Sequence, residues 1–227
     1  MAEEIITEHK KKRKLPKISW KAVGIIAGAI VCIAAVVTGL ILFTNWRNNG
    51  SAYAQRLSEQ IGVSAETAQK YAHVNLQGAS SYACVNMAAE EYPYLFESPR
   101  KTDVLGVTIP QWVIYIGEKN NTVTDVLYYD YRQLQKFGNG VKLDAKLDIQ
   151  GITSGMNQDA VHEYVGFDPL CTAFNAQGYT ESYKYWFKDQ NTGNTVSYFV
   201  RVQYDDNICK KVTEEEVIFV LPYLSER

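Results

Sequence analysis

Histidine and cysteine are scarce in this chain, with three and four copies among 227 residues. None of them stands in a Cys-x-x-Cys or His-x-x-x-His spacing, which argues against the common zinc sites. Beyond residue 46 only Cys84, Cys171 and Cys209 occur, too few for a disulfide scaffold. Cys171 and Cys209 flank the strands expected near the C-terminus, so we expect either a disulfide between them or two buried free thiols.

Phosphate-binding sequences are also missing. The chain has no glycine-rich phosphate loop and no Gly-x-Gly-x-x-Gly fingerprint. Residues 47–227 carry 16 basic and 22 acidic side chains, a net charge of −6. An acidic surface argues against nucleic acid as a partner. We therefore expect no nucleic acid and no cofactor.

Charge is absent from Ala22 to Thr44, and seven basic residues precede this stretch. At about 1.5 Å per residue, a helix over residues 23–43 would span roughly 31 Å, the thickness of a hydrocarbon core. Because positive residues stay cytoplasmic, the pattern predicts a cytoplasmic basic tail (1–22), a single-pass transmembrane signal anchor (23–44), and an extracytoplasmic remainder in the cell membrane.

Two alternatives concern this predicted anchor. Ala52-Tyr53-Ala54 has the small-x-small form of a signal-peptidase site, so cleavage after Ala54 would leave a secreted domain. Gly24 and Gly28 form Gly-x-x-x-Gly, a pattern that is typical of self-associating membrane helices. Glycine is also common in membrane helices that do not associate.

The residues after the anchor indicate a linker at 45–53 and then a helical and β-hairpin region at 54–149. Apolar spacing and the N-cap Ser64 predict helices over 54–61 and 64–76, and a third from residue 80 through about Phe96. The period then changes to two, which predicts strands over 111–117 and 122–131.

Residues 150–227 carry the clearest pattern. Asn157 is a good helix N-cap, and Gly166 suits the left-handed position that ends a helix. Strands are expected over 180–189, 195–204 and 209–220, where apolar and polar side chains alternate. This region therefore reads as one amphipathic helix against an antiparallel meander.

The segment Gly155-Met156, Val161 and Gly166 follows the pattern Gly-Met-x-x-x-x-Val-x-x-x-x-Gly, with Tyr183–Lys188 and Val200–Asp206 after it. This pattern resembles the small module of the SmpA/OmlA lipoproteins of outer-membrane assembly, which occurs twice in the β-lactamase inhibitor proteins. The resemblance covers about a third of the chain. It implies a protein-binding module without catalytic residues, and two such BLIP-like units if 54–149 is a diverged first copy.

Two sequence patterns are candidates for catalysis. Ser98-Pro-Arg-Lys101 matches Ser-x-x-Lys, but the further motifs of penicillin-recognising enzymes do not follow. Cys84 with His73 or His162 would supply a thiol nucleophile and a base. An exposed polar loop in the first case, and packed or surface residues in the second, are the simpler interpretations.

The polar face of the last hairpin is a candidate binding face because it combines aromatic and basic side chains: Lys184, Trp186, Lys188, Phe199 and Arg201. Such a face suits a protein or a cell-wall glycan. The alternative is that these side chains pack inside the domain.

Together these patterns predict an α+β protein: one transmembrane helix followed by an extracytoplasmic domain of helices packed on antiparallel β-meanders. The function we expect is a non-enzymatic protein-binding or scaffold module of a bacterial cell envelope, whose partner is another envelope protein or a cell-wall component. The alternatives are an envelope hydrolase that uses Ser98 and Lys101 or Cys84, and a membrane sensor that acts through a partner helix.

Overall fold

The computed structural model describes residues 31–39, 49–78, 92–134 and 138–217. The chain divides into two compact units, Met1–Trp46 and Arg47–Arg227. In the first unit, residues 31–39 are helical. The rest of the predicted anchor and tail, with Gly24 and Gly28, lies outside the described residues.

The predicted transmembrane helix is not supported. No helix in the described part of the chain is both long enough and apolar enough to cross a membrane. The signal-anchor prediction, which rested on the uncharged stretch and the basic residues before it, is therefore withdrawn. Cleavage after Ala54, the alternative interpretation, would cut the chain inside helix α2 (Gly50–Ser58), where Ala54 is buried.

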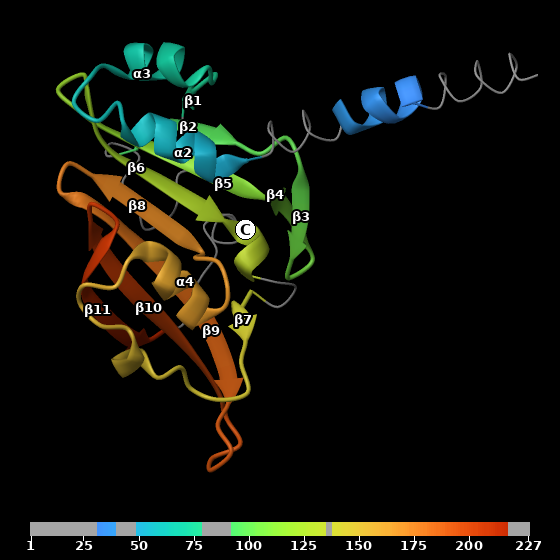
Figure 1. The fold of residues 1–227 in the computed structure, drawn as a ribbon, viewed down its shortest axis with the longest axis vertical. Coiled ribbons are helices and arrows are strands. Elements are labelled where there is room, and N and C mark those ends of the chain that lie inside the picture. The colour runs from blue at the N-terminus through green and yellow to red at the C-terminus, as the bar shows by residue number, and fades with distance from the viewer. Residues whose placement is uncertain (1–30, 40–48, 79–91, 135–137, 218–227) are drawn as a thin grey trace, which may run out of the picture. The chain divides into compact units, whose positions relative to one another are not determined.

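The described residues of the second unit build a nine-stranded sheet (Figure 1). Eight strands follow one another in space as β1 (Gln77–Gly78), β2 (Tyr94–Glu97), β5 (Trp112–Lys119), β6 (Thr122–Asp130), β8 (Cys171–Asn175), β9 (Gly178–Lys188), β10 (Thr195–Asp205) and β11 (Ile208–Glu216). These neighbours pair antiparallel, and β7 (Val141–Lys142) pairs parallel with β9. Because β6 pairs directly with β8, the sheet continues across the boundary that we predicted at 149–150.

In the described part of the chain, three helices cover one face of this sheet. Helices α2 and α3 (Ala65–Ala72) pack on β5 and β6, and α4 (Gln158–Val165) packs on β9, β10 and β11. The opposite face holds a second core, to which the hairpin of β3 (Lys101–Val104) and β4 (Val107–Pro110) and the 3-10 helix η1 (Tyr131–Leu134) contribute. A second 3-10 turn, η2 (Ile149–Gly151), precedes α4.

Local sequence signals explain the helix ends. Ser64 caps α3 by accepting a hydrogen bond from the backbone N–H of Thr67, and Asn157 caps α4 through Ala160. Gly166 ends α4 with a φ of 79°, a left-handed conformation that glycine adopts without steric cost. These caps and the antiparallel meander of β9, β10 and β11 confirm the α+β prediction for this region.

Other predictions differ from the structure in the residues that it describes. The third helix was expected to run through Phe96, but residues 94–97 form β2, and residues 79–91 lie outside the described residues. The expected linker at 45–53 contains the first residues of α2. Strand β8 was not predicted, because Cys171–Asn175 is short and its side chains do not alternate clearly between apolar and polar.

The first turn of α2 lies almost against the sheet. A Cβ atom on Gly50 would lie 2.5 Å from a ring carbon of Trp112 and 2.7 Å from a ring carbon of Tyr128. Real Cβ contacts are not this short, so only glycine permits the approach.

We predict that Gly50→Ala lowers the free energy of unfolding by about 1–3 kcal/mol, because an added methyl group overpacks the core. A decrease in the free energy of unfolding is diagnostic, because alanine in place of glycine normally stabilises a helix by about 0.5–1 kcal/mol. Chemical denaturation measures the change. Gly78→Ala is the control, because among the described residues no atom other than those of its chain neighbours lies within 4 Å of its Cβ position. A stabilised Gly50→Ala variant would contradict the packing of α2.

Candidate functional site

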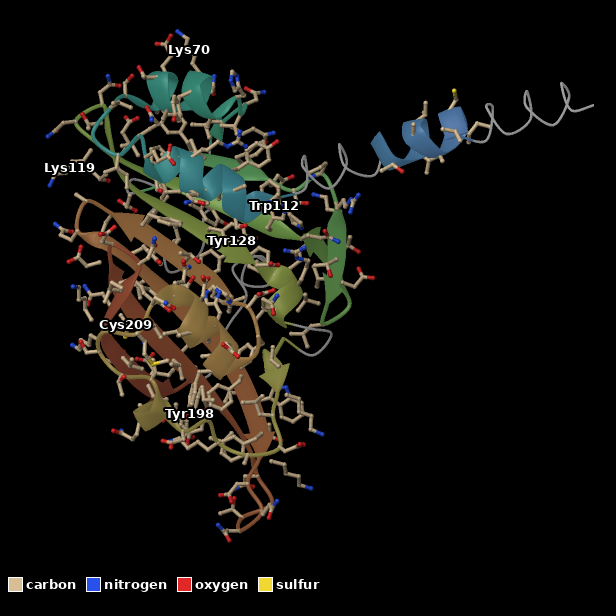
Figure 2. The ribbon with its side chains drawn as sticks, in the orientation of Figure 1. Lys70, Trp112, Lys119, Tyr128, Tyr198 and Cys209 are labelled. Carbon is tan, nitrogen blue, oxygen red and sulfur yellow. The ribbon has the colours of Figure 1, made fainter. Side chains whose placement is uncertain are left out.

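A pocket of about 350 Å³ lies between α2 and α4, over strands β6, β8 and β9. Figure 2 shows Tyr128 of β6 in the space between these two helices. The volume falls in the range of small-ligand pockets. Side chains from six elements and the loops beside them line the pocket, among them Ser51, Gln55, Tyr128, Asp130, Arg132, Gln158, His162, Asp168, Thr172, Phe174, Tyr179, Glu181 and Asn207.

Glu181 places a carboxylate on the helix-covered face of β9. Its residue is only 2% exposed, and it accepts hydrogen bonds from three side chains. The Nε2 atoms of His162 and Gln158 lie 2.9 and 2.7 Å away, and the Tyr183 hydroxyl donates at 2.6 Å. Both oxygens are therefore engaged by donors from α4 and β9.

These contacts shift two pKa values in opposite directions. Burial alone would raise the pKa of the Glu181 carboxyl, but the donors from His162, Tyr183 and Gln158 outweigh it and lower that pKa. The hydrogen bond to Glu181 raises the pKa of the His162 ring against the opposing effect of burial. The pair is therefore most stable as carboxylate and imidazolium.

A second buried carboxylate, Asp130, lies at the end of β6 and is 4% exposed. It accepts from the Arg132 Nε at 2.7 Å, from a terminal guanidinium nitrogen, and from the Arg132 backbone N–H at 3.1 Å. The Tyr128 hydroxyl also donates to it at 3.4 Å. These bonds raise the pKa of Arg132, whose side chain remains 45% exposed beside the pocket.

The floor of the pocket between these two pairs is aromatic. Tyr179 stacks on Tyr204 with ring centroids 4.8 Å apart, and Phe174 lies 5.6 Å from Tyr179. The Tyr179 hydroxyl donates to the Asn207 side chain at 2.8 Å. Buried Thr172 lies between Tyr128 and Glu181 in the strand register.

The acids of this site are more buried than the cations that they bind. The two buried carboxylates accept hydrogen bonds from Arg132 and His162, whose side chains are 45% and 35% exposed. The third carboxylate, Asp168, is exposed and accepts from Gln133 at 3.4 Å. No group of three or more side chains that could hold a metal ion occurs among the described residues.

Of the predicted catalytic residues that the structure describes, Ser98, Lys101 and His73 do not line this pocket. Ser98 is buried at the turn after β2, where its hydroxyl accepts from the Arg100 backbone N–H, and Lys101 begins β3 and pairs with Glu97. Cys84 lies outside the described residues. His73 ends α3 in a left-handed conformation, and only His162 lines the pocket.

The predicted binding face lies on the other side of the sheet from α4. Lys184 pairs with Phe199 in the register, and both are buried. Burial lowers the pKa of Lys184 to about 8, and its ammonium lies 5.4 Å from the Phe199 ring centroid.

The outer part of that face is more accessible. Arg201 forms an ion pair with Glu215, Trp186 faces the Lys142 ammonium, and Lys188 is exposed. Lys184 and Phe199 therefore pack inward, as the alternative interpretation expected, and a binding role for the other three stays a prediction.

The predicted disulfide is absent. Cys171 and Cys209 are both buried, and no disulfide joins them. Cys171 belongs to the core on the β3–β4 side of the sheet, whereas Cys209 belongs to the core under α4. Strands β9 and β10 separate β8 from β11, so the two thiols are not neighbours.

Sequence reasoning missed Glu181 and Asp130, although a signal was present. Alternation along β9 puts Glu181 on the same face as Tyr183 and Tyr185, which are fully buried. A carboxylate on an otherwise buried face requires donors. The same reasoning applies to Asp130, which follows Val126 and Tyr128 along one face of β6.

Comparison with protein-family models and with curated proteins gives no match to this chain. The resemblance to the SmpA/OmlA and β-lactamase inhibitor modules therefore stays a prediction.

We predict that Glu181→Gln lowers the pKa of His162, because the carboxylate is the main cause that raises it. In the unchanged protein the ring should titrate above 6.5, the value of an unperturbed histidine. Titration of the ring protons by nuclear magnetic resonance measures both values. Glu163→Gln, an exposed substitution on the same helix, is the control and should leave the His162 titration unchanged.

The free energy of unfolding should depend on pH through the same pair of residues, His162 and Glu181. Since folding raises the pKa of His162, its contribution is complete below about pH 6.5 and disappears as pH rises through the folded pKa. Since folding lowers the pKa of Glu181, its contribution is present above about pH 4.5 and disappears as pH falls through the folded pKa. A free energy of unfolding that declines from pH 6 to 8 equally in the unchanged protein and in His162→Gln would contradict this assignment.

Proposed function

We propose that the unit formed by residues 47–227 is a non-enzymatic protein-binding module, and that the pocket between α2 and α4 receives a short segment of a partner protein. The observation that carries the proposal is the pocket itself, whose two cationic side chains, Arg132 and His162, are already paired with buried carboxylates. Side chains that are fixed before binding lose little conformational freedom when a ligand arrives. A pre-organised aromatic floor adds apolar area to the same surface.

The hydrogen bonds of the site favour binding over catalysis. An oriented base needs a nucleophile within hydrogen-bond reach, but the bonds that the His162 ring makes in the described structure go to Glu181. The Ser51 hydroxyl beside the pocket donates to Asn49. Burial raises the pKa of Tyr128 and Tyr179, which keeps these phenols protonated and suits them to hydrogen bonding rather than to nucleophilic attack.

The proposal agrees with what the sequence resemblance implies. Helix α4 and the strands β9, β10 and β11 are the segments that carry the resemblance to protein-binding modules. They supply one wall of the pocket and part of its floor, through His162, Glu181 and Tyr179. The proposal concerns binding alone and requires no membrane anchor.

We predict that a photo-crosslinking residue at Gln55, which is exposed at the pocket, forms a defined adduct with a partner in intact cells of the source organism. The same residue at Lys119, the exposed last residue of β5 and outside the pocket lining, should not form that adduct. Mass spectrometry of the adduct locates the attachment site on the partner.

A blocking variant tests whether the pocket itself is occupied. Ser51→Trp should abolish the Gln55 adduct, because an indole on exposed Ser51 fills space between α2 and the sheet. Glu163→Trp, an exposed change on α4 outside the pocket lining, should leave the adduct in place. Adducts at Gln55 that persist in Ser51→Trp, or that also form at Lys119, would refute the proposal.

A further inference from the structure

We propose that the pocket recognises the free C-terminal carboxylate of its partner's chain, with Arg132 as the anchor. This inference rests on the proposed function and names the chemistry of the segment that enters the pocket. It follows from which atoms of the charged pairs are buried and which remain accessible.

The accessible groups of the two pairs are cationic donors. Asp130 is 5% exposed at its side chain and Arg132 is 45% exposed, while Glu181 is 3% exposed and His162 is 35% exposed. All four side chains line the pocket, and in each pair the cation is the more accessible partner. A ligand therefore meets N–H donors first, although the residues beneath them are acidic.

Arg132 is arranged as a carboxylate receptor. A guanidinium has five N–H donors, and Asp130 engages its Nε and one terminal nitrogen, which leaves further N–H groups for a ligand. Asp130 also fixes the plane of the guanidinium, so little conformational freedom remains to be lost. Arginine and carboxylate groups form paired, charge-assisted hydrogen bonds of high directional specificity.

The charge around the pocket favours a carboxylate over a phosphate. Asp168 is exposed at the rim, and Asp159 and Asp168 both contribute to the raised pKa of His162. A group with one negative charge meets less repulsion from these acids than a dianion does. Capture of a chain's terminal carboxylate is also a recurrent mode of peptide recognition.

The spacing of the two acid–cation pairs favours a peptide over a small acid. Strand β8 lies between β6, which carries Asp130, and β9, which carries Glu181. Asp130 lies two residues beyond Tyr128, which is in register with Glu181 across β8. Two strand spacings together with that offset amount to roughly 12 Å, which three or four extended residues cover at about 3.3–3.6 Å each. The terminal carboxylate would then lie at Arg132, with a preceding carbonyl near the protonated His162 and side chains over Phe174 and Tyr179.

Selection from two random peptide libraries on the purified full-length chain tests the inference. One library displays its variable residues at a free C-terminus, and the other displays them internally. We expect enrichment from the first library alone. The selected sequences are then synthesised as free acids and as C-terminal amides, and their affinities are compared by fluorescence anisotropy at pH 6.

We expect amidation to weaken binding roughly ten- to hundredfold, because it removes charge-assisted hydrogen bonds to Arg132. Arg132→Gln should weaken the free acid by a similar factor and leave the amide nearly unchanged. The double variant Asp130→Asn with Arg132→Gln removes both charges of the pair, so it provides the same test if the single variant unfolds. Arg100→Gln, in the exposed turn after β2, is the matched control and should bind as the unchanged protein does.

Each contrary outcome has its own meaning. Enrichment from the internal library alone, or equal affinity of acid and amide, overturns the carboxylate inference and leaves the proposed binding function standing. No enrichment from either library, together with no Gln55 adduct, overturns both. N-acetylphenylalanine that binds as tightly as the selected peptide would show a small-acid site instead, and inorganic phosphate that displaces the peptide at equal concentration would refute the preference for a carboxylate.

Discussion

One buried carboxylate fixes where α4 lies on the sheet. Glu181 lies on the apolar face of β9, where an ionised group without donors would be costly. Two of its three donors, His162 and Gln158, come from α4, one helical turn apart. The helix must therefore keep this face over the strand, and the wall and floor of the pocket on that side follow from the same requirement.

Asp130 is the corresponding buried carboxylate on the other side of the pocket. Its donors come from Arg132 in η1 and from Tyr128 on its own strand. Ion pairs of this kind add little net stability, because desolvation offsets much of the attraction. Their effect is orientation: each acid is hidden and each cation is held at the edge of the pocket. A unit with a net charge of −6 thereby presents a local cluster of donors.

Some of this structure follows from local sequence. The caps at Ser64, Asn157 and Gly166 and the alternation along β9 and β10 were predicted, because these signals act over a few residues. The central pairing of β6 with β8 was not, since Cys171–Asn175 carries no clear period and its partner lies more than forty residues earlier.

The pocket was harder still to predict. Its residues come from segments between Ser51 and Asn207 that only the sheet brings together. The candidate sites that we took from short motifs, Ser98 with Lys101 and the Cys171–Cys209 pair, depended on neighbours in sequence or on assumed proximity. The buried positions of Glu181 and Asp130 were the more informative signal, because a charge on a buried face demands partners from elsewhere in the chain.

A double-mutant cycle between His162 and Glu181 tests the central claim most directly. It compares His162→Ala, Glu181→Gln and the double variant by their free energies of unfolding at pH 6. The account predicts a coupling of at least about 1 kcal/mol, since the two groups share one network. Effects that add to within about 0.3–0.5 kcal/mol would show that the two residues act independently, and would contradict the role assigned to this pair in positioning α4.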